Sequence, residues 1–181
     1  MQEIATSIFI AAKPDRIWRH LSAFHRYPAW NPFIVAMTGH RGVGEKIVAT
    51  MRLVSADGTR AADREISARI VKVEDEHEIR WTHGSWLPGL MDFEHWVRIA
   101  PCKGGAKFHQ HLRVEGLLTG MLKEDYFAMF RAGFEAMNAA LKELVEAPAT
   151  ERSDPLPIAN DNTGDAPIPP DKRRRASPSA F

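Results

Sequence analysis

The chain has 181 residues, of which 44% are hydrophobic and 26% are charged, enough for one domain with a buried core. Lysine plus arginine (24) nearly balance aspartate plus glutamate (23), so we do not expect a nucleic-acid-binding surface, which usually needs a basic excess. The single cysteine excludes an intramolecular disulfide, and the N-terminus has no basic signal-peptide region, so we expect a cytoplasmic protein. No apolar run is long enough to predict a membrane span.

The composition changes at Pro148. Seven of the 12 prolines lie between this residue and the C-terminus, and the segment has no periodic apolar pattern. Such a segment cannot bury enough apolar surface to offset the entropy lost on ordering. We therefore predict a folded domain over residues 1–147 and a disordered Pro-rich tail over residues 148–181.

The folded part begins with a strand and two short helices. Residues 4–11 alternate around Ile4, Ile8 and Ile10, which predicts a strand with one buried face. Pro14 suits the first turn of a helix, and a second short helical turn is predicted over residues 23–28.

Six more strands are predicted in the middle of the chain, at residues 33–38, 45–54, 63–73, 77–83, 91–99 and 106–115. Short turns separate them, among them Asp57-Gly58 and Lys103-Gly104-Gly105. Consecutive short strands joined by tight turns predict an antiparallel sheet.

The last predicted element is a long helix, from about Thr119, a candidate N-cap, to Glu146. Its broad apolar stripe must lie against an apolar surface, and the concave face of the sheet is the one available. Gly133 inside it costs about 1 kcal/mol relative to alanine. This glycine predicts either a close approach to the sheet or room for a ligand, and we favour the ligand.

The chain resembles a known family in several segments that follow one another in the right order. They are Trp30-Asn31-Pro32-Phe33, Ile79-Arg80-Trp81, and the segments at 89–95, 105–118 and 137–142. Over about residues 3–147 these segments resemble the START-like helix-grip (SRPBCC) superfamily, which includes birch-pollen-allergen-like proteins and polyketide cyclase/dehydratase and lipid-transport proteins.

The resemblance implies an α+β helix-grip fold: a seven-stranded antiparallel sheet wrapped around a long C-terminal helix, with two short helices after the first strand. It also implies a cavity between sheet and helix. Members bind lipids, steroids, polyketides or plant hormones, and some catalyse cyclisation or dehydration, so the fold alone does not decide the function.

Alternation along the strands places a set of aromatic and polar side chains inside. The candidate ligand-binding residues are Trp81, Phe93, His95, Phe108, Gln110, Phe130 and Phe134. Many relatives carry an inward histidine and an acid on the strand after Gly105, where this chain has Gln110 and Leu112, so a possible acid/base pair is missing. His95 is either a hydrogen-bond donor to a ligand, a general acid or base, or a buried histidine held by a neighbour such as Gln110.

The other side chains with reactive groups point to the outer face or to turns. His109 and His111 form an H-x-H pair that alternation directs to solvent, among cations that disfavour a metal ion. Trp96 is expected on the same outer face, and Cys102 lies in a turn without a base to activate it. We therefore expect no metal and no cofactor.

Three functions remain open. The first is binding of a small hydrophobic molecule, lipid- or polyketide-like, with His95 and Gln110 orienting its polar part. The second is a cyclase/dehydratase-type enzyme with His95 as acid or base. The third is a ligand-free interaction domain, and the sequence leaves the ligand and the oligomeric state undecided.

Overall fold

The computed structural model describes residues 1–55, 58–59, 63–84, 87–122 and 124–148. The elements are β1 (Gln2–Ile10), α1 (Pro14–Leu21), the 3-10 helix η1 (Phe24–Ala29), β2 (Ile34–Gly39), β3 (Lys46–Met51), β4 (Arg64–Glu74), β5 (Glu78–Gly84), β6 (Asp92–Cys102), β7 (Gly105–Glu115), the 3-10 helix η2 (Thr119–Met121) and α2 (Glu124–Glu146). The predicted order of strand, two short helical segments, six strands and long helix is confirmed.

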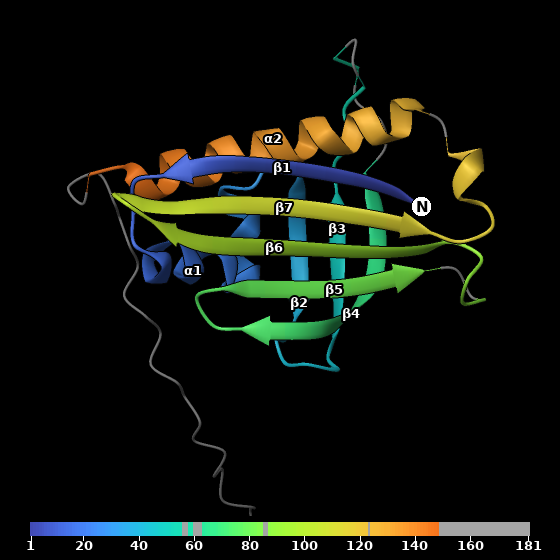
Figure 1. The fold of residues 1–181 in the computed structure, drawn as a ribbon, viewed down its shortest axis with the longest axis horizontal. Helices are drawn as coiled ribbons and strands as arrows, with labels where there is room; N and C mark the ends of the chain where they lie inside the picture. Colours follow the sequence, from blue (N-terminus) through green and yellow to red (C-terminus); the bar gives the residue numbers. More distant parts are fainter. Residues whose placement is uncertain (56–57, 60–62, 85–86, 123, 149–181) are drawn as a thin grey trace, which may run out of the picture. The chain divides into compact units, whose positions relative to one another are not determined.

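All seven strands form one antiparallel sheet in the order β1-β7-β6-β5-β4-β3-β2. Among the strand pairs of the described residues, only β1 with β7 joins distant parts of the chain, and this pairing runs from Gln2 opposite Val114 to Ile10 opposite Ala106. The sheet curls, so that β2 and β3 cross behind the front strands while α2 lies along β1 (Figure 1). The predicted α+β helix-grip fold is therefore confirmed.

The apolar stripe of α2 is the part of the helix that the sheet covers. It consists of Phe130, Phe134, Met137, Leu141 and Val145, each at most 1% exposed. Their spacing of three and four residues places them on one face of the helix. A hydrogen bond also holds the helix to β1: Lys142 Nζ donates to the carbonyl of Phe9 at 3.0 Å.

One predicted detail of the helices is wrong, and a second is confirmed in a tighter form. Thr119 does not cap the long helix: it begins η2, and its Oγ1 donates to the carbonyl of Gly116 at 2.9 Å. Extended backbone at Leu122 separates this turn from α2, which begins at Glu124. The second short helix is a 3-10 segment with Pro28 inside it, where a proline cannot donate a backbone hydrogen bond.

Gly133 is explained by packing, so our ligand interpretation of this residue is wrong. A Cβ atom placed on Gly133 would lie 2.2 Å from Cδ2 of Phe33, which shows that an aromatic ring occupies this space. The ring of Phe33 also packs edge-on against Phe130 and Phe134, with centroids 5.7 and 5.5 Å apart. The glycine therefore allows the close approach that was the other prediction.

The predicted tail lies outside the described residues, except for Pro148, and part of the predicted turn at Asp57-Gly58 does as well. The division into domain and tail stays a prediction. Within the described ranges, neither helix combines the length and the apolar character that crossing a membrane requires.

Candidate ligand-binding site

The seven predicted site residues all lie on the surfaces where the sheet and α2 face each other. Six of them are at most 2% exposed, and Phe93, near the start of β6, is half-buried. Phe108 lies between Ile8 on β1 and Ile99 on β6, and these three side chains continue the apolar inner surface of the sheet beyond Gln110.

His95 is the polar side chain at the centre of this region. Its ring lies 4.3 Å from that of Trp81 and stacks on Phe134 at 4.8 Å, measured between centroids. Burial lowers the pKa of His95 to about 3, His83 lowers it slightly further, and the side chain of Gln110 raises it through a hydrogen-bonding interaction. The imidazole is therefore neutral at neutral pH, and its buried Nε2 has no hydrogen-bond partner among the described residues.

Gln110 connects the sheet to α2. Its Nε2 donates to the carbonyl of Phe134 at 3.2 Å and to Oδ1 of Asn138 at 2.7 Å. Asn138 in turn donates from Nδ2 to Oγ1 of Thr6 at 3.1 Å. The other end of the Gln110 amide, Oε1, is buried and has no partner in the described part of the chain.

His83 is a third polar group of this region, and sequence reasoning missed it. Its ring stacks on Phe93 with centroids 4.6 Å apart, and its buried Nδ1 has no partner among the described residues. Burial lowers the pKa of His83 to about 4. Strand alternation could have found it, because His83 lies two residues after Trp81 and therefore on the same face.

Asn138, Phe33 and Tyr126 were also missed. Asn138 interrupts the apolar stripe of α2, four residues after Phe134, and such a polar residue on a buried face needs a partner. Tyr126 is half-buried and its ring lies 4.9 Å from that of Phe130. The contact of Phe33 with α2 gives no sequence signal, because it depends on where the helix lies.

The Trp-Asn-Pro-Phe segment of the family resemblance has a structural explanation. Oδ1 of Asn31 accepts the backbone N–H groups of Phe33 and Ile34 at 2.9 and 2.8 Å. This turn starts β2 and directs the ring of Phe33 into the interior. The segment also lines an open surface hollow of about 430 Å³, which lies away from the predicted site.

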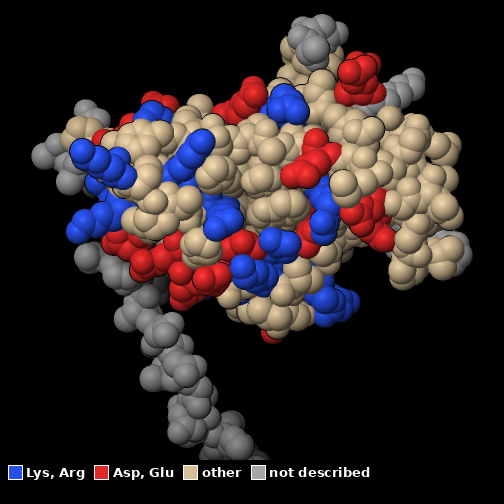
Figure 2. Space-filling model, viewed as in Figure 1, with Lys and Arg blue, Asp and Glu red and all other residues tan. Residues whose placement is uncertain are grey.

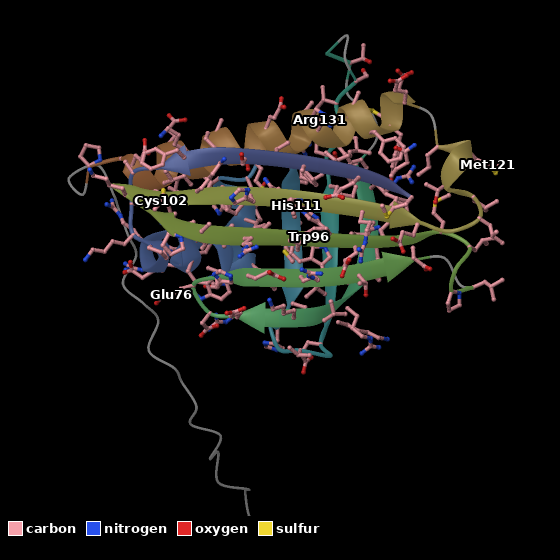
Figure 3. The ribbon with its side chains drawn as sticks, viewed as in Figure 1. Glu76, Trp96, Cys102, His111, Met121 and Arg131 are labelled. Carbon is pink, nitrogen blue, oxygen red and sulfur yellow. The ribbon has the colours of Figure 1, made fainter. Side chains whose placement is uncertain are left out.

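One end of the sheet carries exposed apolar side chains. Leu87, Leu117 and Met121 are 48%, 87% and 74% exposed, and we call them the apolar rim. They follow the ends of β5 and β7, the same end of the sheet at which His83 and Phe93 lie. Figure 3 shows Met121 projecting from η2, and Figure 2 shows few charged side chains over that region.

The outer face of the sheet is built differently. Trp96 stacks on His111 with centroids 4.7 Å apart (Figure 3). The guanidinium carbon of Arg80 lies 4.7 Å from the centroid of the Trp96 ring. Glu94 accepts hydrogen bonds from Arg80 and Arg113 on the neighbouring strands. Charges of both signs are interspersed on this face (Figure 2), and the predicted outward placement of His109, His111 and Trp96 is confirmed.

Comparisons with known proteins agree with this architecture. A START superfamily protein from Mycobacterium smegmatis superimposes with a TM-score of 0.58 at 17% identity, over 80% of this chain and 97% of that one. Protein MLL2253 from Mesorhizobium loti gives 0.59 at 14% identity, over 80% and 96%. The di-domain ARO/CYC protein BexL from the BE-7585A biosynthetic pathway gives 0.62 at 14% identity, over 81% of this chain and 50% of that protein.

At these identities the superpositions show the shared fold alone. Comparison with curated proteins gives no significant match. The profile of the family described as polyketide cyclase / dehydrase and lipid transport matches residues 1–146, nearly the whole described domain. The chain therefore belongs to this family.

Proposed function

We propose that this protein binds a small hydrophobic ligand, lipid- or polyketide-like, between the sheet and α2. The observation that carries the proposal is a group of three buried polar atoms with no partner among the described residues: Nε2 of His95, Oε1 of Gln110 and Nδ1 of His83. Each such atom costs about 1–3 kcal/mol when it is left unpaired. A bound molecule that supplies the missing hydrogen bonds recovers this free energy.

The surroundings of these atoms favour an apolar ligand. Trp81, Phe93 and Phe134 contact the two imidazoles with their rings. Small-molecule sites commonly combine an apolar lining with a few converging polar groups. In the family to which the chain belongs, lipid transport is one of the described activities.

The apolar rim supports an opening at the end of β5 and β7. Two loops meet there, because the backbone N–H groups of Leu117 and Leu118 donate to the carbonyls of Gly89 and Leu90. These hydrogen bonds lie at the same end of the sheet as the stacked pair of His83 and Phe93, so this end is where we place the entrance to the site.

Acid–base catalysis by His95 has less support. A general acid or base works best when its pKa lies near the working pH. With a pKa of about 3, His95 is a weak base, and it holds almost no acidic proton at neutral pH. We therefore propose binding as the function and leave turnover by a cyclase/dehydratase mechanism as the alternative.

Calorimetric titration with 2-naphthol tests the proposal. We expect one saturable site in the full chain, and about fivefold to tenfold weaker binding in His95→Phe, which keeps an aromatic ring between Trp81 and Phe134 but removes its polar atoms. His109→Phe, on the outer face of β7, is the matched control and should bind as the wild type does. No saturable binding, or equal weakening in both variants, would contradict the proposal.

A further inference from the structure

The Gln110 side chain is held in one orientation. The two ends of a carboxamide have nearly the same shape, so their hydrogen-bond partners decide which end is nitrogen. The end near α2 lies 3.2 Å from the backbone carbonyl oxygen of Phe134. A carbonyl only accepts hydrogen bonds, so this end must be Nε2.

Asn138 adds a second constraint on the same nitrogen. Its Oδ1 lies 2.7 Å from Nε2, while its Nδ2 donates to the hydroxyl of Thr6 on β1. Both hydrogens of Gln110 Nε2 are thereby used. Turning the amide over would place its oxygen against the carbonyl of Phe134 and break both hydrogen bonds.

The amide oxygen is consequently the end that remains for a ligand. Oε1 of Gln110 is buried, and the polar group that it faces among the described residues is the ring of His95, whose pKa it raises, although no hydrogen bond of ordinary length and angle joins the two. Gln110 lies opposite Val97 on β6, and His95 is two residues before Val97 on the same inner face. The site thus presents a fixed acceptor close to a neutral imidazole.

We propose that the ligand directs a hydrogen-bond donor, such as a hydroxyl group, to Gln110, and that Asn138 is the positioning residue that sets this preference. The inference rests on the proposed function, because it names the ligand class for the same site. A ligand that offers only an ether or ketone oxygen would bring two acceptors together and leave Gln110 unpaired. A hydroxylated aromatic or alicyclic molecule satisfies the amide and fits the aromatic lining.

Two pairs of probes of matched shape test this preference by calorimetry. The first pair is 2-naphthol and 2-methylnaphthalene, which differ by a hydroxyl group, and the second is 2-methoxynaphthalene and 2-ethylnaphthalene, which differ by an ether oxygen. We expect Gln110→Met to lower the affinity ratio of the first pair about fivefold to tenfold and to leave that of the second pair unchanged or higher.

Asn138→Leu should lower the first ratio by a smaller factor and raise the second, because the amide is then held only by its hydrogen bond to the carbonyl of Phe134 and turns more easily. A role of Asn138 in stability alone would change both ratios equally. His109→Leu, beside Gln110 but on the outer face, should change neither ratio. Equal hydroxyl preference in the wild type and Gln110→Met would overturn the inference while leaving ligand binding in place.

A measurement without ligand tests the orientation itself. In the NMR spectrum of the full chain, the side-chain NH₂ protons of Gln110 should show nuclear Overhauser contacts to Asn138 and slow exchange with solvent. Contacts from these protons to the His95 ring would show the opposite orientation and overturn the inference. Failure of all four probes to bind would instead overturn the proposed function, and the ligand class with it.

Discussion

On the inner face of the sheet Trp81 lies against His95, and on the outer face Trp96 lies against His111. The inner imidazole is 2% exposed, its Nε2 is unpaired in the described structure, and burial lowers its pKa to about 3. The outer imidazole lies 3.3 Å from a carboxylate oxygen of Glu3. Adjacent strands thus carry the same residue types on both faces, and the surroundings decide what each pair can do.

Electrostatics differ between the two faces in the same way. Outside, Glu94 pairs with Arg80 and Arg113, so charges are neutralised by close partners of opposite sign. Inside, Gln110 and Asn138 bridge the sheet and α2 without any formal charge. The charged groups named on the outer face therefore have partners of opposite sign, whereas the inner face has buried polar atoms without a hydrogen-bond partner among the described residues.

Removing the two indoles should give the largest contrast. Trp81→Ala takes a fully buried ring from the core and should lower the free energy of unfolding by about 3–5 kcal/mol. Trp96→Ala removes a half-buried ring and its contact with Arg80, and should cost about 1 kcal/mol. Urea unfolding of the three proteins measures the difference, and equal losses would contradict the assignment of inner and outer faces.

Acid stability should separate His95 from His109. The pKa of His95 is about 3 in the folded protein and about 6.5 when unfolded, so the unfolded state binds more protons between these values. Stability is therefore lost as the pH falls below about 6.5, by up to about 1.4 kcal/mol per pH unit from this residue.

His95→Phe should remove that part of the slope between about pH 6 and pH 4.5. The pKa of His109 is also lowered, first by partial burial and then by Lys107, so His109→Phe should flatten the curve less. Urea unfolding measured at several pH values checks both variants. An unchanged slope in His95→Phe would show that this imidazole is not buried in its neutral form.

Breaking one polar link on each face should give a smaller contrast. Asn138→Leu leaves a donor of Gln110 without its partner in the interior and should cost about 2 kcal/mol. Glu94→Gln weakens ion pairs that are partly open to solvent and should cost less than about 1 kcal/mol. Thermal unfolding compares the two, and a larger loss for Glu94→Gln would reverse the comparison.

The smallest contrast concerns two glycines. Gly133→Ala gains helix propensity of about 1 kcal/mol but drives a methyl group into the ring of Phe33, and we expect a net loss of about 1–2 kcal/mol. Gly120→Ala is the control, since its new Cβ has no neighbour within 4 Å in the described structure. Stabilisation by Gly133→Ala would mean that Phe33 does not pack there.

Strand alternation predicted which side chains lie inside, and it placed Trp81, His95 and Gln110 correctly. The same rule also predicts that His83 faces inward, because it lies two residues after Trp81 on β5, but this residue was missed. The packing of Phe33 on Gly133 could not be predicted, because these residues lie 100 positions apart and their contact depends on where α2 crosses the sheet. The depth of burial that lowers the pKa of His95 depends on the same packing.

The central claim is that ligands bind between the sheet and α2. The most direct measurement is the indole N–H region of the NMR spectrum during titration with 2-naphthol, with both resonances assigned by Trp81→Phe and Trp96→Phe. The account predicts that the Trp81 signal shifts saturably while that of Trp96 stays in place. A shift of Trp96 alone, or no saturable shift of Trp81, would contradict it.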